Sequence, residues 1–289
     1  MLRALSSGVS GIQQFQNRLD VIGNNIANSN TIAFKAARTD FADAFSQTLQ
    51  VSSASSSGSG QAGMQVGSGV ITSSVKNIFT QGALNRTGVG TDLAIDGDGF
   101  FVVRDPVSLV EYVTRAGDFR LDSNNYIITN KGHRVQGFNT PDQTATGPRG
   151  DIQINALLAP STTSPTATMT TFSISRGGNV SVHMSDGTEF SRGQILLQRF
   201  SDPQALLKEG DNLFSGIAAA GPLGGTTPTA GAPGTNGLGN IESSALELSN
   251  VDLANEFANL IATQRGFQAS ARIITTSDEI LQELVNLKR

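Results

Sequence analysis

Residues 249–285 read SNVDLANEFANLIATQRGFQASARIITTSDEILQELV, and this stretch decides the fold because it predicts a long helix. Its apolar residues recur in alternating steps of three and four over about four heptads, which is typical of a coiled coil. We interpret Ser249 as the N-cap and Asp252 as the acidic residue three positions later. Further apolar residues such as Ile261 and Leu284 give the helix more than one apolar flank. The seam is expected at Phe257, Leu260, Phe267, Ile274 and Leu281.

Residues 1–28 carry a second narrow apolar seam. Gly8 and Gly11 lower the helix propensity by about 1 kcal/mol each, so this helix is marginal in isolation. Gln16, on a row beside the seam, and Gln264, in the C-terminal seam, are polar interruptions that we expect to fix the register between helices. The seam residues, which recur every seven positions, are Leu5, Ile12, Leu19 and Ile26.

Neither terminal helix can bury its seam alone, and no other long helical pattern lies between them. We therefore expect the two ends to pair with each other or with copies from neighbouring chains, in a domain made of residues 1–45 and 246–289. The alternative is that each helix packs separately on the middle of the chain.

The middle of the chain predicts short strands joined by tight turns, so residues 76–245 are expected to form a mainly antiparallel β body. Residues 151–200 are a candidate outer lobe of that body. Residues 93–103 contain two apolar runs around two Asp-Gly pairs, which is typical of a hairpin. Residues 46–75 include a Ser/Gly-rich run and are expected to be a flexible linker or an extended stretch. The predicted fold class is α+β, with a discontinuous coiled-coil domain.

The composition excludes several classes of function. The chain has 20 Lys+Arg against 24 Asp+Glu, a net charge of −4, and lacks the basic patch of a nucleic-acid-binding protein. Charged residues make up 15% of the chain, against about 25% in an average domain. The absence of cysteine excludes disulfides and thiolate chemistry. No apolar run is long enough for membrane insertion, and the first residues do not resemble a cleavable signal peptide.

No pattern in the sequence indicates a catalytic, cofactor or metal site. His133 and His183 lie 50 residues apart and are interpreted as surface or turn residues. Asp92, Asp96 and Asp98 lack the closing Glu of a calcium loop, because Val103 occupies the twelfth position. The glycine-rich pieces lack the spacing of a phosphate-binding loop. We therefore expect a protein that is not an enzyme and holds no cofactor.

Residues 19–35, LDVIGNNIANSNTIAFK, closely resemble the signature of the bacterial flagellar rod and hook family. Residues 93–101, 114–122 and 246–254 are similar to further blocks of that family, in the same order. Ala33 stands where the family usually has glycine. The signature residues implied by the resemblance are Asn24, Asn25, Asn28, Phe34, Lys35, Ser249, Asn250, Val251 and Asp252.

The resemblance implies a structural subunit that leaves the cell through the flagellar type III export apparatus and polymerises helically. Its terminal helices would line an inner tube, and its partners would be other copies and other axial proteins (rod, hook cap and hook–filament junction).

The two ends of the chain are most similar to short hook proteins, so the main prediction is an extracellular hook, a flexible joint that transmits torque. The alternative is a distal rod subunit in the periplasm, because the chain lacks a large inserted domain. A secreted β-rich adhesin is a weaker alternative, since it needs no matched heptad ends. A carbohydrate-active enzyme is also weaker, because the chain has no Trp and 2 Tyr to stack on sugars.

Overall fold

The computed structural model describes residues 2–52, 62–139, 149–154, 168–222 and 231–287. The chain divides into two compact units, of which the first, here called the helix unit, comprises Met1–Ser29, Ala36–Ile78 and Val251–Arg289. The second, here called the β body, comprises Asn30–Lys35 and Phe79–Asn250. The predicted α+β class, with a helix at each end of the chain and an antiparallel β body, is confirmed.

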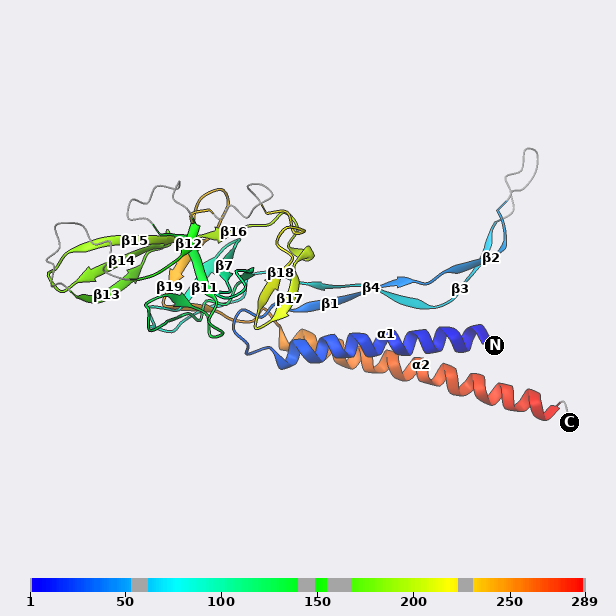
Figure 1. Ribbon diagram of the computed structural model, residues 1–289. Helices are drawn as coiled ribbons and strands as arrows, with labels where there is room; N and C mark the ends of the chain where they lie inside the picture. Colours follow the sequence, from blue (N-terminus) through cyan, green and yellow to red (C-terminus); the bar gives the residue numbers. More distant parts are fainter. Residues whose placement is uncertain (1, 53–61, 140–148, 155–167, 223–230, 288–289) are drawn as a thin grey trace. The chain divides into compact units, whose positions relative to one another are not determined.

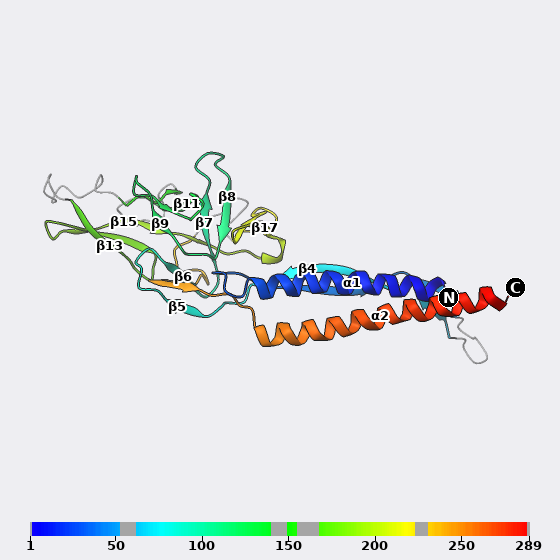
Figure 2. The same cartoon turned by 90° about the horizontal axis from the view of Figure 1, so that it is seen from below.

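The helix unit contains α1 (Leu2–Ala27) and α2 (Leu253–Leu287), which lie side by side and run in opposite directions (Figures 1 and 2). A ribbon of β1 (Ala37–Asp43) and β4 (Val70–Asn77), paired antiparallel, also packs on α1. The Phe15 ring of α1 meets the Phe41 ring of β1 edge to face, with centroids 6.3 Å apart. The terminal helices therefore pair with each other, and α1 is covered on a second side.

The described residues of the stretch 46–75, expected to be a flexible linker or an extended stretch, lie mostly in extended strands. The stretch holds β2 (Ser46–Gln50) and β3 (Met64–Gly67), which form an antiparallel hairpin, and most of β4. All residues of β2 and β3 are exposed. Composition suggested a linker because Ser, Gln and Gly dominate, but β-branched residues such as Thr48 and Val66 favour a strand. The Ser/Gly-rich residues 53–61 lie outside the described residues.

The β body is built on a 12-stranded sheet whose main path runs β13-β14-β15-β11-β7-β8-β18-β17. The structure describes all of its pairs as antiparallel. Its strands are β7 (Phe100–Arg104), β8 (Glu111–Thr114), β9 (Arg120–Leu121), β10 (Ile127–Ile128), β11 (Arg134–Phe138), β12 (Arg149–Asp151), β13 (Met169–Ile174), β14 (Asn179–Met184), β15 (Glu189–Ile195), β16 (Leu197–Gln198), β17 (Leu207–Gly210) and β18 (Leu213–Ser215).

Two further antiparallel strand pairs of the β body join segments that are distant in the sequence. Strand β6 (Leu93–Asp96) pairs with β19 (Asn240–Ser243), and β5 (Leu84–Arg86) pairs with β20 (Ala245–Glu247). The hairpin predicted for residues 93–103 is therefore wrong, because β6 and β7 belong to different sheets. Gly97 and Gly99 adopt positive φ angles of 111° and 135°. They change the direction of the chain between β6 and β7, but the two strands do not pair with each other.

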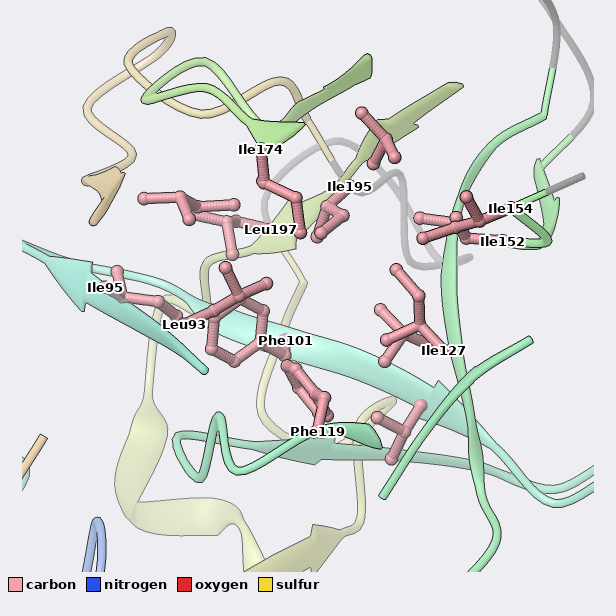
Figure 3. Close-up of a cluster of buried hydrophobic side chains, with 14 of the residues drawn as sticks. Leu93, Ile95, Phe101, Phe119, Ile127, Ile152, Ile154, Ile174, Ile195 and Leu197 are labelled. Carbon is pink, nitrogen blue, oxygen red and sulfur yellow. The ribbon is translucent and has the colours of Figure 1, made fainter. Parts of the chain in front are cut away.

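Figure 3 shows the apolar core of the β body, where Phe101, Ile127 and Ile195 come from separate strands and converge. Each of these side chains is almost fully buried, which stabilises the fold by about 1.5–3 kcal/mol per side chain. The alternation of apolar and polar residues in β14, where Val180, Val182 and Met184 are buried, is the pattern expected of a half-buried strand.

Gly117→Ala tests how tightly the strands of the β body are packed. An added Cβ would lie 1.6 Å from the carbonyl oxygen of Leu93, so the backbone must move. We expect a loss of about 3 kcal/mol in the free energy of unfolding. Tyr112 and Tyr126 both lie in the β body, so urea unfolding followed by tyrosine fluorescence measures this unit.

Gly150→Ala is the matched control, because an added Cβ there meets no atom within 4 Å. It should change the free energy of unfolding by less than about 0.5 kcal/mol. Equal effects of the two substitutions would contradict the close approach of Gly117 to Leu93.

Candidate assembly surfaces

Small residues allow the backbones of α1 and α2 to approach each other closely. A Cβ added at Gly8 would lie 3.1 Å from Cγ1 of Ile274, and one at Gly11 would lie 3.0 Å from Oγ of Ser270. At Gly266 an added Cβ would lie 2.7 Å from Cζ of Phe15. Glycines that weaken α1 as an isolated helix therefore allow its backbone to approach α2.

The predicted seam residues divide into two groups. Those on α1 and four of those on α2 are half-buried, whereas Phe257 is 50% exposed. Gln16 and Gln264 are also exposed rather than buried between α1 and α2, so their part in fixing a register between subunits stays a prediction. The half-buried residues are Leu5, Ile12, Leu19, Ile26, Leu260, Phe267, Ile274 and Leu281.

The most buried row of α2 consists of hydroxyl residues, Thr263, Ser270 and Ser277, seven positions apart. Two of these hydroxyls donate to carbonyls of the preceding turn, from Thr263 to Asn259 at 2.6 Å and from Ser277 to Ile273 at 2.7 Å. Their polar groups are thus satisfied inside the helix, and their small size permits close packing. Sequence reasoning that counted apolar residues missed this row, although the sevenfold spacing of Ser and Thr was visible.

Asn25 is a buried polar junction within the helix unit. Its Nδ2 donates to the carbonyl of Ala37 at 2.8 Å and to Oε1 of Glu256 at 3.0 Å. Its Oδ1 accepts from the backbone N–H of Ala37 at 3.0 Å. One signature side chain therefore joins α1, the start of β1 and the first turn of α2. The neighbouring Asn28 donates to Asn24 at 2.9 Å and closes the end of α1.

The N-cap of α2 is Asp252. Its carboxylate accepts from the backbone N–H of Ala254 at 2.9 Å and of Asn255 at 3.3 Å. The assignment of Ser249 as the N-cap is therefore wrong, because α2 begins at Leu253. Both residues are good caps, but the Asp carboxylate also interacts favourably with the helix dipole. Val251, another signature residue, is half-buried.

The signature residue Lys35 belongs to a buried ion cluster in the β body, here called the Glu247 cluster (Lys35, Arg115 and Glu247). Nζ of Lys35 lies 2.5 Å from Oε1 of Glu247 and donates to the carbonyl of Thr80 at 2.8 Å. The same Oε1 accepts from the backbone N–H of Gly82 at 2.8 Å, and Arg115 Nη1 lies 3.5 Å from Oε2. Burial lowers the pKa of Lys35 and of Arg115, and the Glu247 carboxylate opposes both shifts.

Backbone hydrogen bonds tie the same segments together. The N–H of Ala33 donates to the carbonyl of Glu247 at 2.8 Å, and the N–H of Asn250 donates to that of Phe34 at 3.4 Å. Asn250 Nδ2 reaches Oγ1 of Thr80 at 2.9 Å. Ala33 holds a left-handed φ of 55°, the conformation that glycine adopts most easily. The cluster thus fastens residues 30–35, 79–82 and 245–250, the chain ends of the β body.

Helix α2 presents exposed apolar side chains that no described residue covers fully. They lie on more than one side of the helix and along most of its length, and eight such side chains on one helix make α2 the candidate interaction surface. The described part of the chain contains no helix that is long and apolar enough to span a bilayer. We name these residues the α2 face: Leu253, Phe257, Ile261, Ile273, Ile280, Leu284, Val285 and Leu287.

Three family models match separate segments of the chain. "Flagella basal body rod protein" matches residues 5–35. "Flagellar hook protein FlgE/F/G D1 domain" matches residues 94–182, and "Flagellar basal body rod FlgEFG protein C-terminal" matches residues 242–287. The first and last of these cover much of α1 and α2.

Curated relatives match from end to end. The flagellar basal-body rod protein FlgG of Bacillus subtilis is 42% identical over 290 residues, covering 100% of both chains. FlgG of Borreliella burgdorferi is 34% identical over 292 residues, again covering 100% of both. The flagellar hook protein FlgE of the same species is 28% identical over 448 aligned residues, covering 100% of both.

These comparisons and the fold define an axial structural protein of the bacterial flagellum. The chain belongs to the flagellar rod and hook protein family.

Glu247→Gln tests the Glu247 cluster. The substitution leaves Lys35 and Arg115 buried without an anion, so we expect a loss of about 3–5 kcal/mol in the free energy of unfolding of the β body, measured by tyrosine fluorescence in urea. The control is Glu242→Gln, whose partner Arg176 is 74% exposed, and which should cost less than about 1 kcal/mol. A similar loss from both substitutions would contradict the role given to Glu247.

Proposed function

We propose that this protein is a subunit of the distal rod of the flagellar basal body, the shaft that carries torque from the motor to the hook. The observation that supports this most strongly is the 42% identity with a basal-body rod protein over the full length of both chains. The comparison with a hook protein gives 28% identity and runs over 448 positions, against the 289 residues of this chain. The alignment therefore includes hook-protein residues that have no counterpart in this chain, and this favours the rod. The main prediction from the sequence was the hook.

The geometry of the helix unit supports self-assembly into a helical polymer. α1 and α2 bury part of their seam against each other within one chain, and the α2 face remains available for neighbouring copies. A contact between different faces of identical subunits continues as a filament when it does not close into a ring. The exposed β2–β3 hairpin adds strand edges and side chains such as Phe45, which is 90% exposed. Contacts by two separate elements would resist sliding between subunits, as a shaft requires.

The proposed partners follow from this position. They are further copies of the same chain, other axial proteins of the rod and hook, and the type III export apparatus that delivers the subunit. The proposed location is the periplasmic part of the flagellum, and the role is mechanical, without catalysis.

Electron microscopy of immunogold-labelled hook–basal bodies tests the rod proposal. Antibodies against the β body should label the shaft below the hook in the bacterium that carries this gene. Labelling along the hook itself would instead favour the hook and would overturn the rod proposal.

Ile280→Asp and Phe257→Asp test the assembly surface. Both side chains belong to the α2 face, and a buried carboxylate between subunits is costly. We expect each variant to keep its helical circular dichroism as a monomer and to need at least about a tenfold higher concentration to form tubes, because 1.4 kcal/mol corresponds to a factor of ten. Phe267 is less suitable because it is half-buried on the α1–α2 seam.

Gln268→Asp is the matched control, since Gln268 is an exposed polar residue of the same helix. It should form tubes at the concentration of the unmodified protein. Unaltered assembly of both α2-face variants would show that the α2 face is not an interface.

A further inference from the structure

A cavity of about 230 Å³ opens beside the Glu247 cluster, within the β body. Three aromatic rings form its apolar wall, and three charged side chains reach its lining. Its volume suits one small organic group rather than a large ligand. The lining residues that matter here are Phe79, Phe100, Phe200, Asp98, Arg115 and Arg199.

The charges around this cavity do not balance. Lys35 is matched by Glu247 at 2.5 Å, and Arg199 faces Asp98 at 3.5 Å across a more exposed contact. Arg115 lies 3.5 Å from Glu247, and the Asp98 carboxylate, which Arg199 also faces, attracts it over a longer distance, although its side chain is only 4% exposed. Two buried cations therefore share one buried carboxylate.

The guanidinium of Arg115 also has unused hydrogen-bonding capacity. Its Nε is buried and donates to no acceptor in the described part of the chain. The ring of Phe100 lies 5.2 Å from Cζ of Arg115 and offers only the weak attraction of an aromatic face. A buried charge without a full partner is costly, and a carboxylate is the group that matches the fork of a guanidinium.

We propose that this cavity binds a carboxylate, held by Arg115, on a small apolar or aromatic group that packs against the three phenylalanine rings. The carboxylate balances the second buried cation, and the rings take up the apolar part. Two sources carry this chemistry: an Asp or Glu side chain of a neighbouring copy, and a free small carboxylate. The site shares no residue with the α2 face and does not depend on the choice between rod and hook.

Calorimetric unfolding of the full chain with benzoate tests the site. Benzoate should raise the Tm of the β body in a saturable way, because a ligand that binds the folded state stabilises it. The neutral isostere benzamide, and sodium chloride at equal ionic strength, should not. The absence of a saturable rise with benzoate would overturn the proposal.

Two variants show whether the effect belongs to this cavity. Arg115→Met removes the guanidinium and should raise the Kd for benzoate at least tenfold. Ser201→Leu should do the same, because Ser201 is an exposed lining residue and a larger side chain narrows the cavity while Arg115 remains. This second variant keeps the test decisive if Arg115→Met does not fold. Arg120→Met, an exposed arginine of β9, is the control and should bind benzoate normally. An unchanged Kd in Ser201→Leu would place the binding elsewhere and refute the site.

Assembly measurements then separate the two sources. If the carboxylate comes from a neighbouring copy, benzoate but not benzamide should slow tube formation by the unmodified protein and have no such effect on Ser201→Leu. If it is a free anion, benzoate should raise the Tm without slowing assembly. Either outcome upholds the carboxylate site, provided that the calorimetric rise is present.

Discussion

The packing of α1 against α2 requires residues near the two ends of a 289-residue chain to meet at van der Waals distance. Gly8, Gly11 and Gly266 allow the close approach, and the hydroxyls of Thr263 and Ser277 are satisfied within α2 so that they can be buried. Within one chain the seam is half-buried, and the exposed apolar residues of the α2 face remain for other subunits. Since both ends of the chain belong to the helix unit, the β body is formed by the residues between them in the sequence.

The β body is closed where its chain ends meet. β19 and β20, near the C-terminal end of the β body, pair with β6 and β5. Glu247 pairs with Lys35 and accepts from the N–H of Gly82, and Lys35 also donates to the carbonyl of Thr80. These contacts join residues more than a hundred positions apart, so the entropy of closing a long loop opposes them until the core has formed. The β body therefore folds fully only when residues 240–250 have paired with β5, β6 and Lys35. Without Glu247, the buried cations Lys35 and Arg115 would lose their shared carboxylate, which is costly.

Sequence reasoning anticipated features that rest on large apolar residues and missed those that rest on small or polar ones. The heptad spacing of Leu260, Phe267 and Ile274 placed them on the helix seam, and alternation predicted strands in the β body. The hydroxyl row of α2 escaped because Ser and Thr do not count as apolar. The partner of β6 could not be predicted, because Asp-Gly turns specify that the chain bends and not which strand it then meets. The resemblance identified Asn25 and Lys35 as signature residues, but their partners Ala37 and Glu247 are set by tertiary structure.

Cysteine cross-linking of Gly11→Cys/Ser270→Cys tests most directly whether the two ends of one chain pair with each other. The natural chain has no cysteine, and a Cβ at Gly11 would lie 3.6 Å from Cβ of Ser270, within the range of about 3.5–4.5 Å found in disulfides. Oxidation of the dilute monomer should give an intrachain disulfide, seen as faster migration in a non-reducing denaturing gel, with no dimer. Cross-linked dimers alone, or no disulfide at all, would contradict the pairing of α1 with α2 in one subunit.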